Sequence, residues 1–429
     1  MYRRRDQRST SFATIATTAL ISSVASVLIV RNFLETEKKI KHRIVTEYGV
    51  GDPAFVRTMG ALLGPPLLPG NRVKMLQNGK EIFPAMLSAI RSAQRTITFE
   101  NFVFADGRIS DEFAEAFAER ARAGVKVHFL QDALGCEHPR GWAIDLMKRS
   151  GVEVEIFRYL HLTRMNFRTH RKLLVVDGKV GFIGGVGISD AWDTDGVTRG
   201  EWRDSQYRVE GPVVGQFQQA FMDNWIQTRA AVLHGDDYFP ELLPDGDQTC
   251  QVFKSSESEG ADSARLMLLV SIAAARKSIR IANAYFVPDD LTIEMLVDAQ
   301  RRGVQVEIIV PGEDLDQQLV RKIGRSRWKP MLDAGVRFFE YQPARFHCKY
   351  MIVDDCWCSV GSTNFDNRSL RLNEEANLNI LCCDFAADHA RIFEKDKSLS
   401  KEVTLRAWSH RPLSEKISGH LGCVLRSQI

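Results

Sequence analysis

The chain has 429 residues, of which 44% are hydrophobic and 26% are charged, and its formal net charge is +3. The composition is that of a globular protein, and the length predicts two or three domains. The small net charge argues against a dedicated nucleic-acid-binding protein. None of the eight cysteines belongs to a Cys-x2-Cys pair, which argues against a zinc ribbon. We expect buried free thiols, which favour a reducing compartment.

The N-terminal segment has the composition of a membrane anchor. Four arginines precede an apolar run from Phe12 to Val30, which as a helix would measure about 28 Å against a hydrocarbon core of about 30 Å. A cleaved signal peptide with a small-residue site near Ala25 is the alternative. Because the apolar run continues to Val30, we expect residues 1–30 to form a single-pass transmembrane helix, with the body on the cytoplasmic side.

The remaining chain predicts a repeated body. Residues 31–72 form a connector, irregular and rich in glycine and proline in its second part, and residues 232–262 form an acidic linker between the halves. In the first half, 73–231, we expect a strand over 95–104, a helix over 109–123 and a strand over 125–130. In the second half, 263–395, the same order falls at 278–287, 291–302 and 304–310. Strands that alternate with helices predict an α/β fold, and residues 396–429 form a C-terminal tail.

One pattern, His-x-Lys-x4-Asp, occurs once in each half. A glycine follows each copy at the same distance, which indicates a duplicated active-site unit. Side chains alternate along a strand, so each histidine shares a face with its lysine. The aspartates have the opposite parity, and we expect them to support the strand ends. Histidines and lysines without a carboxylate cluster favour metal-free chemistry on a phosphodiester. The six residues are His170, Lys172, Asp177, His347, Lys349 and Asp354.

This duplicated motif resembles the phospholipase D superfamily. Further strings, at 201–204, 285–289, 361–369 and 372–375, are similar to the bacterial cardiolipin synthase branch. The resemblance covers about residues 73–395. It implies two phospholipase-D-like α/β sandwich halves related by a pseudo-two-fold axis, and it implies no cofactor.

The resemblance also implies roles for individual residues. One histidine attacks phosphorus and the other is the acid and base; family precedent favours His170 as the nucleophile, but the residues leave this open. The two lysines bind the non-bridging oxygens. The substrate-binding candidates are Ser362 and Asn364 on phosphate, Glu375 and Asp204 (or Glu201) as carboxylates that orient histidine, and Arg168 with Arg203 on a lipid headgroup. Gly185 and Gly187 stand where the first half would place counterparts of Ser362 and Asn364.

The function that these residues favour is a membrane-bound phosphatidyl transfer between two phosphatidylglycerol molecules in a bacterial membrane. A phospholipase D that uses water as the acceptor is the first alternative. A nuclease of the superfamily and a catalytically degenerate scaffold are the others. We expect an anionic phospholipid substrate, no nucleic-acid partner and no metal; the sequence does not predict the oligomeric state.

Overall fold

The computed structural model describes residues 12–33, 40–135, 141–157, 166–256 and 262–423. The chain divides into two units, each considered by itself. One unit contains residues 1–41 with 160–166, and the other, the body, contains residues 42–159 and 167–429. The duplicated motifs lie in the body, which is therefore the unit that bears on function.

Helix α1 (Phe12–Phe33) coincides with the expected membrane anchor. Its serine and threonine side chains include Thr18, whose hydroxyl donates to the carbonyl of Thr14 at 2.9 Å. Among the residues that the structure describes, no helix is long and apolar enough to cross a membrane. The expected single-pass helix is therefore not supported, and the basic segment before it, residues 1–11, lies outside the described residues.

The body contains two runs of elements in the same order. The first run is β1 (Leu68–Gln77), α3 (Asn78–Ser92), β2 (Thr96–Asn101), α4 (Arg108–Arg122), β3 (Lys126–Asp132), α5 (Trp142–Arg149), β4 (Glu153–Phe157), β5 (Arg168–Thr169), β6 (Leu173–Val176), β7 (Val180–Gly184), β8 (Trp202–Arg203), β9 (Ser205–Glu210) and α6 (Val214–Arg229). The second run is β10 (Gln248–Ser255), α7 (Ser263–Ala274), β11 (Ser278–Asn283), α8 (Asp290–Arg301), β12 (Gln305–Pro311), α9 (Gln318–Ser326), α10 (Lys329–Ala334), β13 (Arg337–Tyr341), β14 (Arg345–Phe346), β15 (Lys349–Val353), β16 (Trp357–Gly361), α11 (Asn367–Arg371), β17 (Asn373–Leu381) and α12 (Cys383–Ser398).

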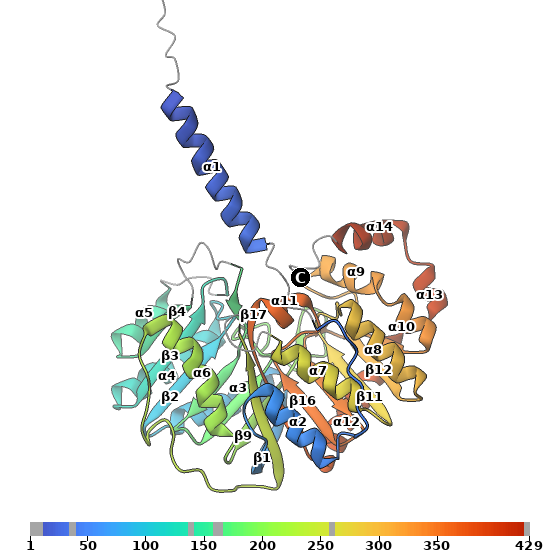
Figure 1. The fold of residues 1–429 in the computed structure, drawn as a ribbon. Helices are drawn as coiled ribbons and strands as arrows, with labels where there is room; N and C mark the ends of the chain where they lie inside the picture. Colours follow the sequence, from blue (N-terminus) through green and yellow to red (C-terminus); the bar gives the residue numbers. More distant parts are fainter. Residues whose placement is uncertain (1–11, 34–39, 136–140, 158–165, 257–261, 424–429) are drawn as a thin grey trace, which may run out of the picture. The chain divides into compact units, whose positions relative to one another are not determined.

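The strand order confirms the pseudo-two-fold arrangement of two α/β halves (Figure 1). Within the described part of the chain, the path runs β4-β3-β2-β6-β7-β9-β1 in the first half and β10-β17-β16-β15-β11-β12-β13 in the second. Strands β1 and β10 pair antiparallel and join the halves. In each half, the strand that follows the motif histidine (β6 or β15) pairs antiparallel with the first strand of the parallel set (β2 or β11). This register brings both motifs to corresponding positions.

The predicted strand–helix–strand repeats are confirmed within a few residues. Helices α4 and α8 fall on the predicted ranges, and each is followed by a glycine, Gly124 or Gly303, with φ +91°. This left-handed conformation, which glycine adopts without steric cost, turns the chain into the next parallel strand. Asp289 caps α8, because its carboxylate accepts the N–H of Thr292 at 2.8 Å.

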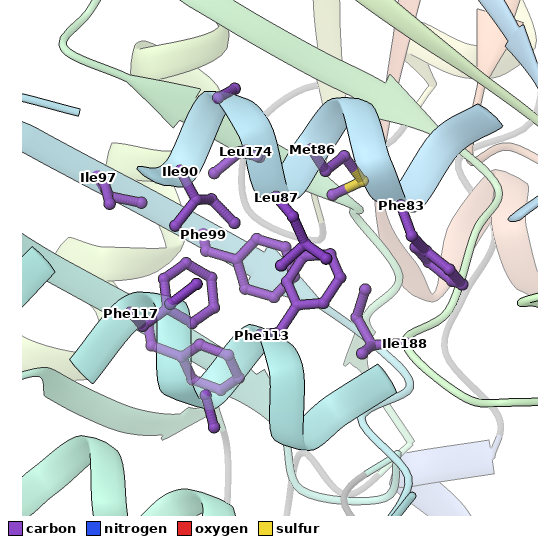
Figure 2. Packing of buried hydrophobic residues seen from close by; sticks show 14 of the residues in the cluster. Phe83, Met86, Leu87, Ile90, Ile97, Phe99, Phe113, Phe117, Leu174 and Ile188 are labelled. Atoms are coloured by element: carbon purple, nitrogen blue, oxygen red, sulfur yellow. The ribbon is translucent and has the colours of Figure 1, made fainter. Parts of the chain in front are cut away.

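Apolar side chains spaced three and four apart bury the faces of the first-half helices against the sheet. Figure 2 shows Phe83 and Leu87 of α3 on one side of Phe99 of β2, with Phe113 and Phe117 of α4 on the other. The ring centroids of Phe99 and Phe117 lie 5.3 Å apart, and those of Phe83 and Phe113 lie 5.8 Å apart. Burying a side chain of this size stabilises the fold by about 1.5–3 kcal/mol. This core holds the strand ends that carry the motifs.

The expected connector and linker are more structured than predicted. Helix α2 (Pro53–Leu63) lies within the expected irregular connector, capped by Asp52, and its Phe55 packs against Trp357 with ring centroids 4.9 Å apart. Strand β1 begins inside the connector, and β10 lies inside the expected linker. Both segments form strands because each pairs with a strand that lies far away in sequence, β1 with β9 and β10 with β17.

The C-terminal tail also packs on the body. It forms β18 (Ser400–Glu402), α13 (Leu405–Ser409) and α14 (Leu413–Gly422). Trp408 is buried and donates its indole N–H to the carbonyl of Arg325 at 2.7 Å. Strand β18 extends the second-half sheet by pairing with β13.

The expectation of free thiols is wrong for two of the cysteines. Cys356 and Cys383 form a disulfide, because the antiparallel pairing of β16 with β17 brings the start of one strand beside the end of the other. The backbone N–H of Cys382 donates to the carbonyl of Cys356 at 3.0 Å at the same place. Cys250, Cys348, Cys358, Cys382 and Cys423 are free, and Cys136 lies outside the described residues.

Candidate active site

Each motif histidine is held by backbone of the other half. Short strand β5, just before His170, pairs with β17 of the second half, and the N–H of His170 donates to the carbonyl of Glu374 at 2.8 Å. Short strand β14, just before His347, pairs with β8 of the first half, and the N–H of His347 donates to the carbonyl of Arg203 at 2.8 Å. The two halves therefore exchange strands where the histidines lie.

The carboxylates that hold the histidines are exchanged in the same way. Nδ1 of His170 lies 3.0 Å from Oε1 of Glu375, and Nδ1 of His347 lies 2.7 Å from Oδ2 of Asp204. An ionised carboxylate only accepts hydrogen bonds, so each Nδ1 carries the proton and each Nε2 keeps its lone pair when the ring is neutral. The sequence pointed to both carboxylates and, of Asp204 and Glu201, the structure places Asp204 on a histidine. Nothing in the spacing showed that each serves the opposite half.

The motif lysines fold back on their own histidines. Nζ of Lys172 donates to the carbonyl of His170 at 2.8 Å, and Nζ of Lys349 donates to the carbonyl of His347 at 2.7 Å. Each ammonium group has three N–H donors, so further donors remain for an anion. His170 and Lys172 precede β6 and both line one pocket with His347, whereas Lys349 is buried and is not part of its lining.

The motif aspartates lie at strand ends and bind backbone. The carboxylate of Asp177 accepts the N–H groups of residues 94–96 at 2.7–3.2 Å. That of Asp354 accepts those of residues 276–278 at 2.6–2.9 Å. Both aspartates have a left-handed backbone, with φ near +52° and +53°, which asparagine and aspartate tolerate better than most residues. They fix the strands that present the histidines.

Burial controls the protonation of the site. It lowers the pKa of His170 to about 4 and also lowers that of His347, although the neighbouring carboxylates oppose the shift. Burial alone would raise the pKa of Glu375 and Asp204, but the adjacent histidines, the motif lysines and the hydrogen bonds together outweigh it, and both pKa values lie below normal. Burial lowers the pKa of Lys172 to about 7. These shifts favour neutral histidines beside ionised carboxylates.

A pocket of about 380 Å³ lies between the two motifs. The ring of Phe102 stands 5.4 Å from His170. The stacked rings of Trp192 and Trp202, 4.5 Å apart, lie edge-on to His347. Apolar walls of this kind exclude water and strengthen electrostatic interactions with a bound anion. No sequence pattern indicated a role for these aromatic residues. The residues from both halves that line the pocket include His170, Lys172, His347, Asn364, Arg168, Arg368, Tyr285 and Asp316.

Of the two residues expected to contact phosphate, Asn364 lines the pocket and Ser362 does not. Asn364 lines the pocket, and its buried Oδ1 has no hydrogen-bond partner among the described residues. Ser362 is fully buried, and its hydroxyl binds Glu375 instead of lining the pocket. In the first half Gly185 takes its place, where an added Cβ would lie 2.6 Å from Oδ1 of Asp204. The glycine therefore makes room for the carboxylate.

The two arginines expected at a headgroup are also separated. Arg168 lines the pocket. Arg203 is buried and binds the carboxylate of Asp396 through Nε and Nη2 at 3.2 and 3.0 Å, so its role is to join α12 to the first half. The prediction of a headgroup contact is wrong for Arg203, because long-range packing supplies it with a buried partner.

The described residues show no group of three histidine, cysteine or acidic side chains arranged to hold a metal ion. The groups that converge on the pocket are imidazoles, ammonium and guanidinium groups, amides, and the carboxyl groups of Asp316 and Asp366. Such a set suits an anionic phosphate ester.

The comparisons with known proteins agree with this geometry. A crystal structure of phosphatidylserine synthase from Haemophilus influenzae Rd KW20 matches with a TM-score of 0.63 at 13% identity, over 87% of this chain and 97% of that chain. This likeness shows that the two chains share a fold.

Comparisons of the amino-acid sequence identify the family. The family model described as "Cardiolipin synthase, PLD-like domain" matches residues 86–196 and 268–397. Cardiolipin synthase A of Pseudomonas syringae pv. syringae (strain B728a) is 33% identical over 359 residues, which is 82% of this chain and 74% of the relative. Cardiolipin synthase 1 of Bacillus anthracis is 30% identical over 366 residues, with 82% and 72% covered. The chain belongs to the cardiolipin synthase family of phospholipase-D-like proteins.

Proposed function

We propose that this protein transfers a phosphatidyl group from one phosphatidylglycerol molecule to the free hydroxyl of another, forming cardiolipin and releasing glycerol. The observation that carries the proposal is the pair of histidines, one from each half, each held by a carboxylate at Nδ1. Membership of the cardiolipin synthase family supports the choice of substrates. Both substrates are membrane lipids, so the pocket works at a membrane surface.

The first half-reaction forms a phosphohistidine. Nε2 of one histidine, for which we propose His170, attacks phosphorus as the bond from phosphorus to the glycerol oxygen breaks. The other histidine, His347, gives its Nε2 proton to the leaving oxygen. The bound anionic phosphodiester favours the protonated form that this step needs, opposing the effect of burial.

The second half-reaction reverses these roles. His347 takes the proton of the incoming hydroxyl, whose oxygen attacks phosphorus while the bond from phosphorus to His170 breaks. Lys172 and Lys349 stabilise the charge on the non-bridging oxygens in both steps. Glu375 and Asp204 keep each ring in the tautomer with an available Nε2.

Incubation of the purified protein with vesicles of labelled phosphatidylglycerol tests the proposal. We expect equal amounts of cardiolipin and glycerol from the wild type and neither from the His170→Ala, His347→Ala double variant. An Arg280→Gln variant is the matched control, because Arg280 pairs with Asp355 away from the pocket. Phosphatidate in place of cardiolipin would instead establish a phospholipase D with water as acceptor.

A further inference from the structure

Two arginines line the pocket in addition to the motif histidines and lysines. Arg168 lies in β5, two residues before His170, and Arg368 lies in α11 of the second half. Burial lowers the pKa of Arg368, and the charge of Arg168 lowers it further, while the charges of Asp366, Asp132 and Glu375 oppose the shift. Two like charges held together in a partly buried site repel each other, and an anion between them would relieve the repulsion.

Arg168 differs from the other buried arginines near the motifs. Its side chain is only 5% exposed, and its Nη1 lies 3.8 Å from Oδ1 of Asp132, too far for a hydrogen bond. Nε and Nη1 have no hydrogen-bond partner among the described residues. Arg171 and Arg203, in contrast, reach carboxylate oxygens at 3.1 and 3.0 Å. A buried donor without a partner costs free energy, so the Arg168 guanidinium keeps donors that an anion could satisfy.

The donor lipid offers no group for these arginines. Its phosphodiester lies at the reaction centre, between the histidines and lysines, and the glycerol headgroup of phosphatidylglycerol is uncharged. An acceptor phosphatidylglycerol carries its own phosphodiester, separated from the attacking hydroxyl by the glycerol carbons. Water, the acceptor in hydrolysis, has no such group.

We propose that Arg168 and Arg368 form a second phosphate subsite, which binds the phosphodiester of the acceptor lipid and so selects an anionic lipid over water. This inference rests on the proposed transferase function and adds to it the chemical class of the acceptor. The planar guanidinium of Arg168 can bind two phosphate oxygens at once, which a lysine cannot. The subsite positions the acceptor and takes no part in the bond changes at phosphorus.

The test separates transfer from donor cleavage. Vesicles of labelled phosphatidylglycerol are incubated with wild type, Arg168→Gln, Arg368→Gln and the Arg280→Gln control, and cardiolipin and phosphatidate are quantified. We expect the ratio of cardiolipin to phosphatidate to fall about 10–100-fold in Arg168→Gln, as expected for loss of hydrogen bonds to a charged group, and less in Arg368→Gln. Total donor consumption stays within about threefold of the control. Arg168→Lys keeps the charge but not the planar guanidinium, so its ratio of cardiolipin to phosphatidate should lie between those of the wild type and Arg168→Gln.

Two further arms identify the source of the anion. With ethanol as a neutral acceptor, the yield of phosphatidylethanol is the same in Arg168→Gln and the control. Inorganic phosphate lowers the cardiolipin yield of the wild type but not its donor consumption, and this effect is lost in Arg168→Gln. If phosphate lowers both equally, free phosphate binds only at the reaction centre.

The inference is overturned if the product ratio of Arg168→Gln equals that of the control, or if transfer and hydrolysis fall together. A wild type that makes no cardiolipin would instead overturn the proposed function. If Arg168→Gln does not fold, as judged by its thermal unfolding, Arg368→Gln carries the same test, because Arg368 is only half-buried.

Discussion

In both halves of the body a carboxylate binds Nδ1 of the motif histidine, but different groups donate hydrogen bonds to the two carboxylates. Glu375, which binds His170, also accepts the hydroxyls of Ser362 and Ser369. Asp204, which binds His347, instead accepts the indole N–H of Trp192 at 3.2 Å and the backbone N–H of Ser205 at 2.8 Å. One carboxylate is thus held by two hydroxyls and the other by an indole and the backbone.

The imidazole rings of the two histidines also have different aromatic neighbours. Among the described residues, the ring of His170 has one aromatic neighbour, Phe102, whereas His347 is packed by Trp192, Trp202 and Tyr285. Because the carboxylates and short strands cross between the halves, neither half contains a complete histidine site. The duplication therefore supplies one site from two unequal parts, which suits two histidines with different roles.

The largest effect should come from the histidines themselves. His170→Ala should abolish turnover with every donor, because no nucleophile remains. His347→Ala should lower turnover of phosphatidylglycerol by about 10²–10⁴-fold, yet still cleave a donor whose leaving group is p-nitrophenolate, which needs no proton. Rapid-quench measurement should then find phosphohistidine in His347→Ala. If phosphohistidine were found in His170→Ala instead, His347 would be the nucleophile and His170 the acid and base.

Breaking the crossed carboxylates should cost less. Glu375→Gln and Asp204→Asn should each lower kcat, on the order of 10²-fold, because an amide no longer selects the tautomer with a free Nε2 lone pair. Nitrogen-15 NMR of labelled histidine should show the altered ring in the half opposite to the substitution. A change confined to the same half would contradict the exchange.

The residue between the motif histidine and lysine is Arg171 in the first half and Cys348 in the second, and we expect the two to contribute differently to the free energy of unfolding. Arg171 is fully buried and binds Asp223 and Glu374, whereas its counterpart Cys348 lies in the apolar core. Arg171→Met leaves Glu374 buried without its cation and should destabilise the body by about 3–5 kcal/mol. Cys348→Ala should cost about 1–2 kcal/mol, in the range of small core truncations. Urea unfolding checks both, and equal midpoints would refute this difference.

The pH profile should show the smallest effect, about tenfold per pH unit on each limb. His170, with a pKa of about 4, becomes protonated and loses its nucleophilic lone pair below that pH. Lys172, with a pKa of about 7, loses its charge above that pH, so kcat/KM should be greatest between them. The charge of Glu375 raises the pKa of Lys172, so Glu375→Gln should move the alkaline limb to lower pH. A limb that stays in place would remove Lys172 from this role.

Local pattern predicted much of the fold. The alternating strand at 95–104, the apolar spacing of Phe113 and Phe117, and the glycine after each helix led to β2, α4 and the turn into β3, and the same signals worked in the second half. Local pattern failed for β1 and β10, since a strand between two halves is defined by its neighbours. It also failed for Cys356 and Cys383, which only the sheet register brings together.

The sequence by itself determined the chemistry of this protein, because the residue types and the spacing of the two motifs are local and survive any packing. The tertiary structure alone decided which groups act together. Glu375 reaches His170 across 205 positions of sequence and Asp204 reaches His347 across 143, through strand pairs that no spacing can encode. It also decided that Arg203 is buried on Asp396 while Arg168 faces the pocket without a full set of partners. Whether an arginine binds the protein or a ligand depends on what the fold places beside it.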